Sequence, residues 1–227
     1  MNKVSGLVLK IISVLSAIYA VTMGLLFKEG AMTFFTYLSV AAIGIVLAVF
    51  LVFDLTGKKP SRVMYNIKYV FTLCIFVTFL LFNTLLGPTQ VGGLFVSWGN
   101  IYYCSFCAHV LTPVTAVIDF FVSDREYEPK LKEAPLAVLP LFAYVIFVMI
   151  LSSTGYIWYS LNNEPMCAPY NFLNYKAPCG WFGFDLGHIN SQTLGIGVAY
   201  FIIVMSGIFA LIGLGMLAIK RKTVVKA

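Results

Sequence analysis

The segment NIYYCSFCAHVLTPVTAVID, residues 100–119, decides the fold, because it is long and apolar enough to cross a bilayer and still contains a histidine. At helical spacing one side of this segment carries Tyr102, Ser105, His109, Thr112 and Pro113. An ionisable side chain inside a membrane is costly, so His109 is a candidate functional residue. The alternative is that His109 hydrogen-bonds a neighbouring helix and only stabilises the bundle.

The composition excludes a soluble domain. The 227 residues are 60% hydrophobic and 11% charged, and the mean hydropathy is +0.92. Apolar runs of about 20 residues recur along the chain without the period-two alternation of a barrel, which predicts an all-α integral membrane protein with six transmembrane helices. The predicted helices are residues 4–27, 31–54, 66–86, 100–122, 135–154 and 189–219, in a single domain that spans 1–227 and includes an outer aromatic loop at 155–188.

The net charge of +6 is distributed by side of the membrane, so it indicates topology and no nucleic-acid partner. Lysine and arginine gather before the first helix, between the second and third, between the fourth and fifth, and after the last. The opposite side has only Lys28 and Lys176, and Lys10 lies inside the first helix, where it can snorkel to the interface. We expect both termini to be cytoplasmic, in a bacterial-type plasma membrane.

A second polar patch lies in the predicted helix 31–54, where Thr33, Thr36 and Ser39 recur every third residue and share one side. At 1.5 Å per residue, Thr36 lies about 8 Å below the outer end of its helix and His109 about 13 Å below the outer end of its own. A neutral imidazole can remove the proton of a threonine hydroxyl as it attacks a carbonyl. The sequence therefore permits a Thr36–His109 pair reached from the outer leaflet.

Three further polar residues are candidates to orient the histidine or to donate a hydrogen bond to an oxyanion, and these are Ser39, Asn83 and Ser105. His188, at the start of the last predicted helix, is a candidate entrance group or a solvated loop residue.

We expect no metal and no cofactor. Asp54 and Asp119 lie near the cytoplasmic helix ends, where they are poorly placed to share a metal with His109. Cys167 and Cys179 share the outer loop, and the sequence leaves open whether they form a disulfide.

A family resemblance is carried by Phe34-Phe-Thr-Tyr-Leu-Ser39, by Ala108-His-Val-Leu-Thr-Pro113 and by Tyr170-Asn-Phe-Leu173. These stretches resemble the androgen-induced membrane hydrolases and their bacterial multi-pass relatives. The resemblance implies an intramembrane threonine hydrolase of fatty acid esters of hydroxy fatty acids, with the threonine carried over to Thr36 and the histidine to His109. Ser105 and Phe106 stand where the eukaryotic pattern has additional histidine and asparagine residues.

We therefore expect an intramembrane hydrolase of a fatty-acyl ester whose partners are a lipid substrate and the bilayer. Two alternatives belong to other classes. One is a small proton-coupled transporter in which His109 relays protons, and the other is a noncatalytic membrane binding protein or scaffold.

Overall fold

The computed structural model describes residues 3–89, 92–99, 105–161, 164–185 and 195–224. The chain divides into two compact units. Unit 1 comprises Met1–Ala137 and Ala210–Ala227, and unit 2 comprises Val138–Phe209. The two polar patches expected from the sequence both lie in unit 1.

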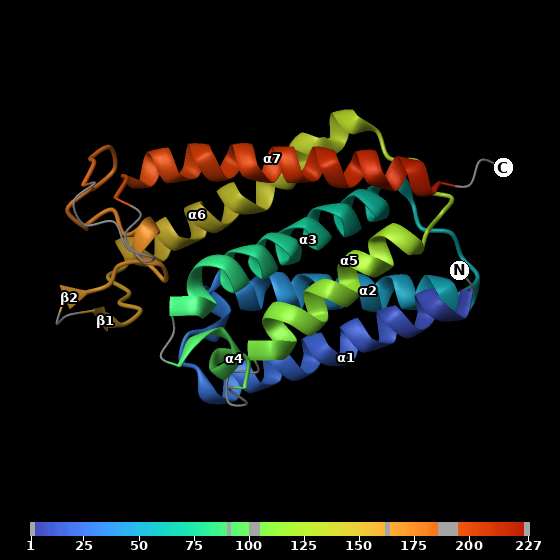
Figure 1. The fold of residues 1–227 in the computed structure, drawn as a ribbon, viewed down its shortest axis with the longest axis horizontal. Coiled ribbons are helices and arrows are strands. Elements are labelled where there is room, and N and C mark those ends of the chain that lie inside the picture. Colours follow the sequence, from blue (N-terminus) through green and yellow to red (C-terminus); the bar gives the residue numbers. More distant parts are fainter. Residues whose placement is uncertain (1–2, 90–91, 100–104, 162–163, 186–194, 225–227) are drawn as a thin grey trace. The chain divides into compact units, whose positions relative to one another are not determined.

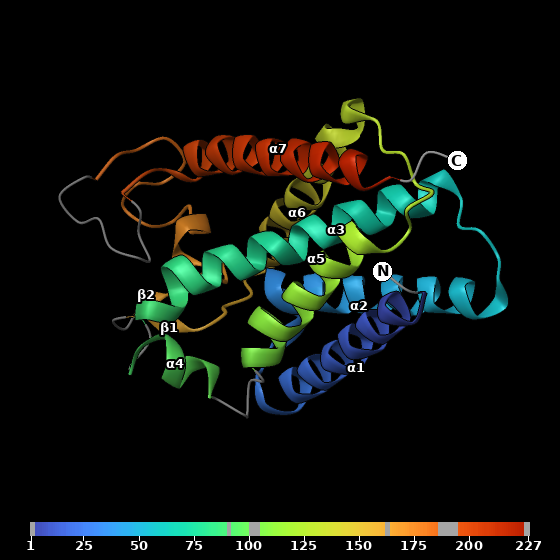
Figure 2. The same ribbon diagram turned by 45° about the vertical axis from the view of Figure 1, so that its right-hand side comes forward.

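Unit 1 is built almost entirely of helix (Figures 1 and 2). Its elements are α1 (Lys3–Phe27), the 3₁₀ turn Ala31–Thr33, α2 (Phe35–Thr56), α3 (Arg62–Leu81), the π-helical turn Phe82–Leu86, the 3₁₀ turn Gly87–Thr89, α4 (Gly93–Trp98), the π-helical turn Cys107–Leu111, α5 (Thr112–Val122) and the second half of α7 (Val198–Thr223). Helices α1 and α3 each pack against both α2 and α5, so these four helices lie side by side.

Unit 2 contains α6 (Leu139–Ser153), which continues the 3₁₀ segment Leu131–Val138, and the first half of α7. Between them lie β1 (Ser160–Leu161), which pairs antiparallel with β2 (Glu164–Pro165), and the 3₁₀ turn Asn171–Leu173. Aromatic rings hold this connection together, since Phe172 stacks on Phe201 with centroids 4.4 Å apart. The aromatic loop expected at 155–188 is thus a folded segment where the structure describes it.

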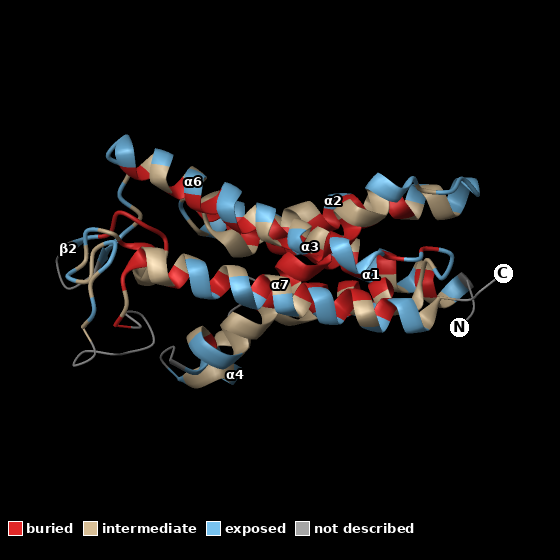
Figure 3. Ribbon diagram, turned by 90° about the horizontal axis from the view of Figure 1, so that it is seen from above, coloured by how far each residue is buried: buried red, intermediate tan, exposed pale blue. Residues whose placement is uncertain are grey.

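Among the described residues, five helices have the length and apolar composition of membrane spans, and they are Val4–Phe27, Phe35–Thr56, Arg62–Leu86, Leu131–Ser153 and Val198–Thr223. This is consistent with a helical multi-pass membrane protein. The predicted helix 100–122 is represented by the shorter apolar helix Cys107–Val122, because residues 100–104 lie outside the described part. Figure 3 shows exposed residues along α1, α6 and α7, and many of them are large and apolar, as a bilayer-facing surface requires.

Two predicted helix starts differ from the structure. The helix predicted at 66–86 begins one turn earlier, because the Ser61 hydroxyl caps it by accepting a hydrogen bond from the Met64 N–H. The helix predicted at 189–219 begins at Val198 within the described residues, because Gly195 takes a left-handed φ of 62° and Ile196 pairs with Phe184 as an isolated bridge.

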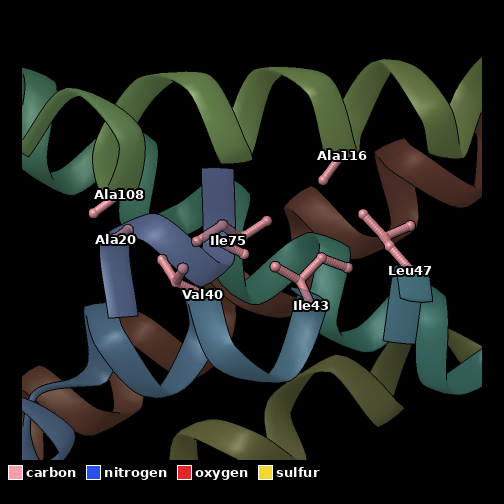
Figure 4. Packing of buried hydrophobic residues seen from close by; sticks show 8 residues of the cluster. Ala20, Val40, Ile43, Leu47, Ile75, Ala108 and Ala116 are labelled. Carbon is pink, nitrogen blue, oxygen red and sulfur yellow. The ribbon is translucent and has the colours of Figure 1, made fainter. Parts of the chain in front are cut away.

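Small residues bring α1 and α2 close together. A Cβ on Gly44 would lie 2.8 Å from the Ala17 Cβ, and one on Gly24 would lie 2.3 Å from the Tyr37 ring. Close approach of this kind replaces the hydrophobic driving force that is missing between helices in lipid. Figure 4 shows the resulting core, which contains Ala17, Ala20, Val40, Ile43, Leu47, Ile75, Ala108 and Ala116.

A chain of alternating charges crosses the interior of unit 1. Asp54 of α2 pairs with Lys10 of α1 at 3.1 Å, Lys10 pairs with Asp119 of α5 at 2.9 Å, and Asp119 pairs with Lys68 of α3 at 2.6 Å. Lys68 also pairs with Asp124. The side chains of Lys10 and Lys68 are 1% exposed and that of Asp119 is 0% exposed. The expectation that Lys10 snorkels is wrong, because two carboxylates hold its ammonium inside the bundle.

At the end of unit 1 where α1 begins, the last turns of α7 and the first turns of α1 both contact Ser123, which follows α5. The Lys220 ammonium on α7 donates to the Ser123 carbonyl, and Gly6 on α1 packs against the Ser123 hydroxyl. That hydroxyl donates to Asp119 at 2.7 Å. We call this end the termini end of unit 1. The end at which α1 stops and α2 begins is called the opposite end.

Replacing Lys68 with methionine should destabilise the protein strongly. The change leaves Asp119 and Asp124 each with one cation fewer, and breaking a buried ion pair typically costs about 3–5 kcal/mol. The measurement is the thermal unfolding midpoint of the detergent-solubilised protein.

The matched control is Lys59→Met, which removes the exposed ion pair between Lys59 and Glu126. Exposed pairs contribute little, so the control should unfold at the wild-type temperature. If the two variants unfold at the same temperature, the internal charge chain is not a stabilising feature.

Candidate functional site

His109 lies where two π-helical turns meet. It belongs to the turn Cys107–Leu111, and its imidazole stacks on the ring of Phe82, the first residue of the turn Phe82–Leu86, with centroids 3.5 Å apart and planes 15° from parallel. Asn83, from the same turn as Phe82, donates from Nδ2 to the His109 carbonyl at 3.0 Å. A π-helical turn is rare and is frequently found at functional sites.

The hydrogen bonds of His109 define which ring nitrogen can act as a base. Its Nδ1 lies 3.0 Å from the Ser105 carbonyl oxygen and 3.3 Å from the Ser105 hydroxyl. Because a carbonyl only accepts, Nδ1 carries the proton in this arrangement and Nε2 keeps its lone pair. Nε2 has no hydrogen-bond partner in the part of the chain that the structure describes, so it is available to take a proton.

Trp98, at the end of α4, fixes the amide that supports His109. Its indole N–H donates to Asn83 Oδ1 at 2.9 Å, which leaves the Asn83 amide nitrogen to donate to the Phe79 carbonyl at 2.7 Å and to the His109 carbonyl. The sequence predicted Asn83 as a supporting residue but not Trp98. The signal that could have indicated Trp98 is the requirement of a partly buried indole N–H for a hydrogen-bond acceptor.

Thr36 is the second residue of α2 and is half-buried. Its hydroxyl has no hydrogen-bond partner among the described residues. The other two hydroxyls of the polar patch do form hydrogen bonds. The Thr33 hydroxyl donates to the Gly30 carbonyl and the Ser39 hydroxyl donates to the Phe35 carbonyl, each at 2.7 Å. The hydroxyl of Ser39 is therefore engaged by its own helix, and that of Thr36 is not.

No hydrogen bond joins Thr36 and His109 in the described structure, although core residues near each of them pack together. Ala108 packs with Ala20 and Val40 in the core (Figure 4), and His109 is the residue after Ala108. Thr36 precedes Val40 by four residues, so it lies on the same face of α2 about 6 Å nearer the helix start. The predicted contact between Thr36 and His109 stays a prediction.

Lys28, which follows α1, brings a positive charge to this end of the bundle. Its ammonium lies 3.4 Å from the centroid of the Phe34 ring and 5.6 Å from that of the Tyr37 ring. Burial lowers the pKa of Lys28 to about 8. The sequence placed Lys28 on the outer side but did not predict its contact with these two rings.

The polar side of residues 100–119 is partly closed by α1. The Thr112 hydroxyl donates to Ser16 at 2.8 Å, and the Ser13 hydroxyl donates to Thr115 at 2.6 Å. These hydroxyls, which follow His109 toward the termini end, are engaged in packing α5 on α1.

The remaining predicted residues do not join the site. His188 lies outside the described residues. Asp54 and Asp119 pair with Lys10, and no group of three metal-ligating side chains that could hold a metal ion occurs in the described ranges. Cys167 and Cys179 are free thiols, and the Cys167 thiol donates to Asn174 Oδ1 at 2.8 Å.

Comparison of the chain with protein-family models, with curated proteins and with solved structures finds no match.

The lowered pKa of Lys28 predicts its reactivity. Only the neutral amine is nucleophilic, so acylation of Lys28 by an amine-reactive ester should rise with pH with a midpoint near 8. The measurement is the labelled fraction of the Lys28 peptide by mass spectrometry across pH 6 to 11. A midpoint near the ordinary lysine value of about 10.4 would show that the ammonium is solvated instead of buried.

Proposed function

We propose that the protein is a six-span intramembrane hydrolase of a lipid ester, with both termini cytoplasmic and the site in the outer half of the bilayer. Thr36 is the nucleophile and His109 is the general base. The proposal is supported by two features of the described residues: a Thr36 hydroxyl that forms no hydrogen bond there, and a His109 imidazole whose Nδ1 is fixed by the Ser105 carbonyl. The resemblance to androgen-induced membrane hydrolases at these positions supports the same assignment.

The chemistry follows from these two groups. Thr36 Oγ1 attacks the ester carbonyl carbon while His109 Nε2 takes the hydroxyl proton. The imidazolium then gives this proton to the departing alcohol oxygen as the carbon–oxygen bond breaks, which leaves an acyl group on Thr36. A water molecule that loses a proton to Nε2 attacks the acyl carbonyl, and the released Thr36 oxygen recovers the proton.

The neighbours of His109 have positioning roles in this scheme. The Ser105 carbonyl holds the productive tautomer and the Phe82 ring limits rotation of the imidazole. Asn83 acts through the His109 carbonyl, so it positions the backbone and does not contact the reacting atoms. Of the two roles expected for Asn83, orienting the histidine and donating to an oxyanion, this contact supports the first.

The Thr112–Ser16 and Ser13–Thr115 bonds favour the hydrolase over a transporter. A proton pathway that continues from His109 toward the termini end needs polar groups that can exchange partners. In this protein the next hydroxyls are occupied by contacts between α1 and α5. A reaction site confined to one half of the bilayer does not need that pathway.

A fluorophosphonate probe tests the nucleophile. It should label the wild-type protein in membranes and should not label Thr36→Ala, because the variant lacks the Oγ1 atom that the probe phosphonylates. Thr36→Ser should keep labelling. His109→Gln should label at least about 100-fold more slowly, since it removes the general base.

The matched control is Thr22→Ala, which removes an exposed hydroxyl from the half of α1 that leads to the start of α2. It should be labelled at the wild-type rate. Equal labelling of Thr36→Ala and wild type would remove Thr36 as the nucleophile.

A further inference from the structure

Lys28 is an exception to the charge pattern of the chain. Basic residues are rare on the side to which the sequence assigns it, because positive charges normally remain on the cytoplasmic side. A lysine in this position therefore needs an explanation other than topology.

The Lys28 ammonium is held by aromatic rings and not by a carboxylate. It lies over the Phe34 ring at 3.4 Å and near the Tyr37 ring at 5.6 Å. Tyr37 is itself fixed, since its ring packs directly on Gly24 of α1. Lys28 forms no ion pair with any carboxylate of the described residues, whereas Lys10 and Lys68 are each paired with two.

A second source of positive potential lies beside Lys28. Helix α2 starts at Phe35, directly after Phe34, and is 22 residues long. Its first turn contains no acidic residue, and the preceding phenylalanine has no side-chain acceptor. The positive end of the α2 dipole therefore reinforces the lysine charge.

These two positive features are adjacent to the candidate site. Phe34 and Tyr37, whose rings contact Lys28, lie on either side of Thr36 in the chain. Both α1 and α2 have the composition of membrane spans, so a ligand that reaches Lys28 shares the bilayer with them. An uncompensated cation in such a place attracts an anion that is attached to an apolar chain.

We propose that Lys28, next to the start of α2, binds the anionic group, a carboxylate or a phosphate, of an amphipathic ligand. The bound anion supplies the negative partner that Lys28 lacks among the described residues, while the rings of Phe34 and Tyr37 hold the lysine in place. The proposal rests on the proposed function only in taking this ligand to be the substrate. Anion binding itself does not depend on turnover.

The test is equilibrium binding to the full-length protein in nanodiscs of neutral phosphatidylcholine. The probes are a fluorescent long-chain alkyl carboxylate, the corresponding alkyl phosphate and the methyl ester of the carboxylate. Lys28→Met should weaken binding of an anionic probe by about tenfold or more, the loss expected for one charge-assisted hydrogen bond, and should leave the neutral methyl ester unchanged. Lys28→Arg should retain most of the anionic affinity, and the probe bound more tightly identifies the anionic group.

A control variant and a comparison with the labelling test separate anion binding at Lys28 from other effects. Lys176→Met removes an exposed lysine from the loop after α6 and should bind all three probes as wild type does. The fluorophosphonate test reports on Thr36, whereas equilibrium binding reports on Lys28 without turnover, so the anion proposal and the hydrolase assignment can fail separately. The proposal is overturned if Lys28→Met binds both anionic probes with wild-type affinity, or if it loses the anionic probes and the methyl ester to the same extent.

Discussion

The charge chain Asp54–Lys10–Asp119–Lys68–Asp124 is the constraint on which the rest of unit 1 depends. Its members come from α1, α2, α3, α5 and the segment after α5, so it links every helix of the four-helix group. A buried charge without its partner is far more costly than a paired one, and each helix is therefore held at the depth where its charge meets the next. The chain therefore fixes the register of the four helices.

This register has consequences at the opposite end of unit 1. Once Lys10 and Asp119 fix α1 against α5, the hydroxyl pairs Ser13–Thr115 and Ser16–Thr112 follow at successive turns. The small residues Ala17, Ala20 and Ala108 then allow the close packing seen in the core. His109 comes directly after Ala108, so its depth is a result of contacts made two to three turns away.

The sequence predicted the helical membrane class well, because long apolar runs can satisfy their backbone only as helices. It also predicted Ser105 and Asn83 as neighbours of His109, since their spacing and depth were readable. It did not predict that Asn83 contacts the histidine carbonyl, because this contact depends on the two π-helical turns, which leave no signature in the hydropathy. The partners of Lys10 and the position of Lys28 were missed for a related reason: charge counting assigns a side of the membrane but not a neighbour.

The central claim is that Thr36 and His109 act as one catalytic unit. The direct measurement is a double-mutant cycle on the hydrolysis of a medium-chain p-nitrophenyl ester by the full-length protein in nanodiscs, with Thr36→Ala, His109→Gln and the combined variant. Residues that act in one step are not additive, so the account predicts that the double variant is no slower than the slower single variant. Losses that multiply, or single variants that hydrolyse the ester at the wild-type rate, would contradict it.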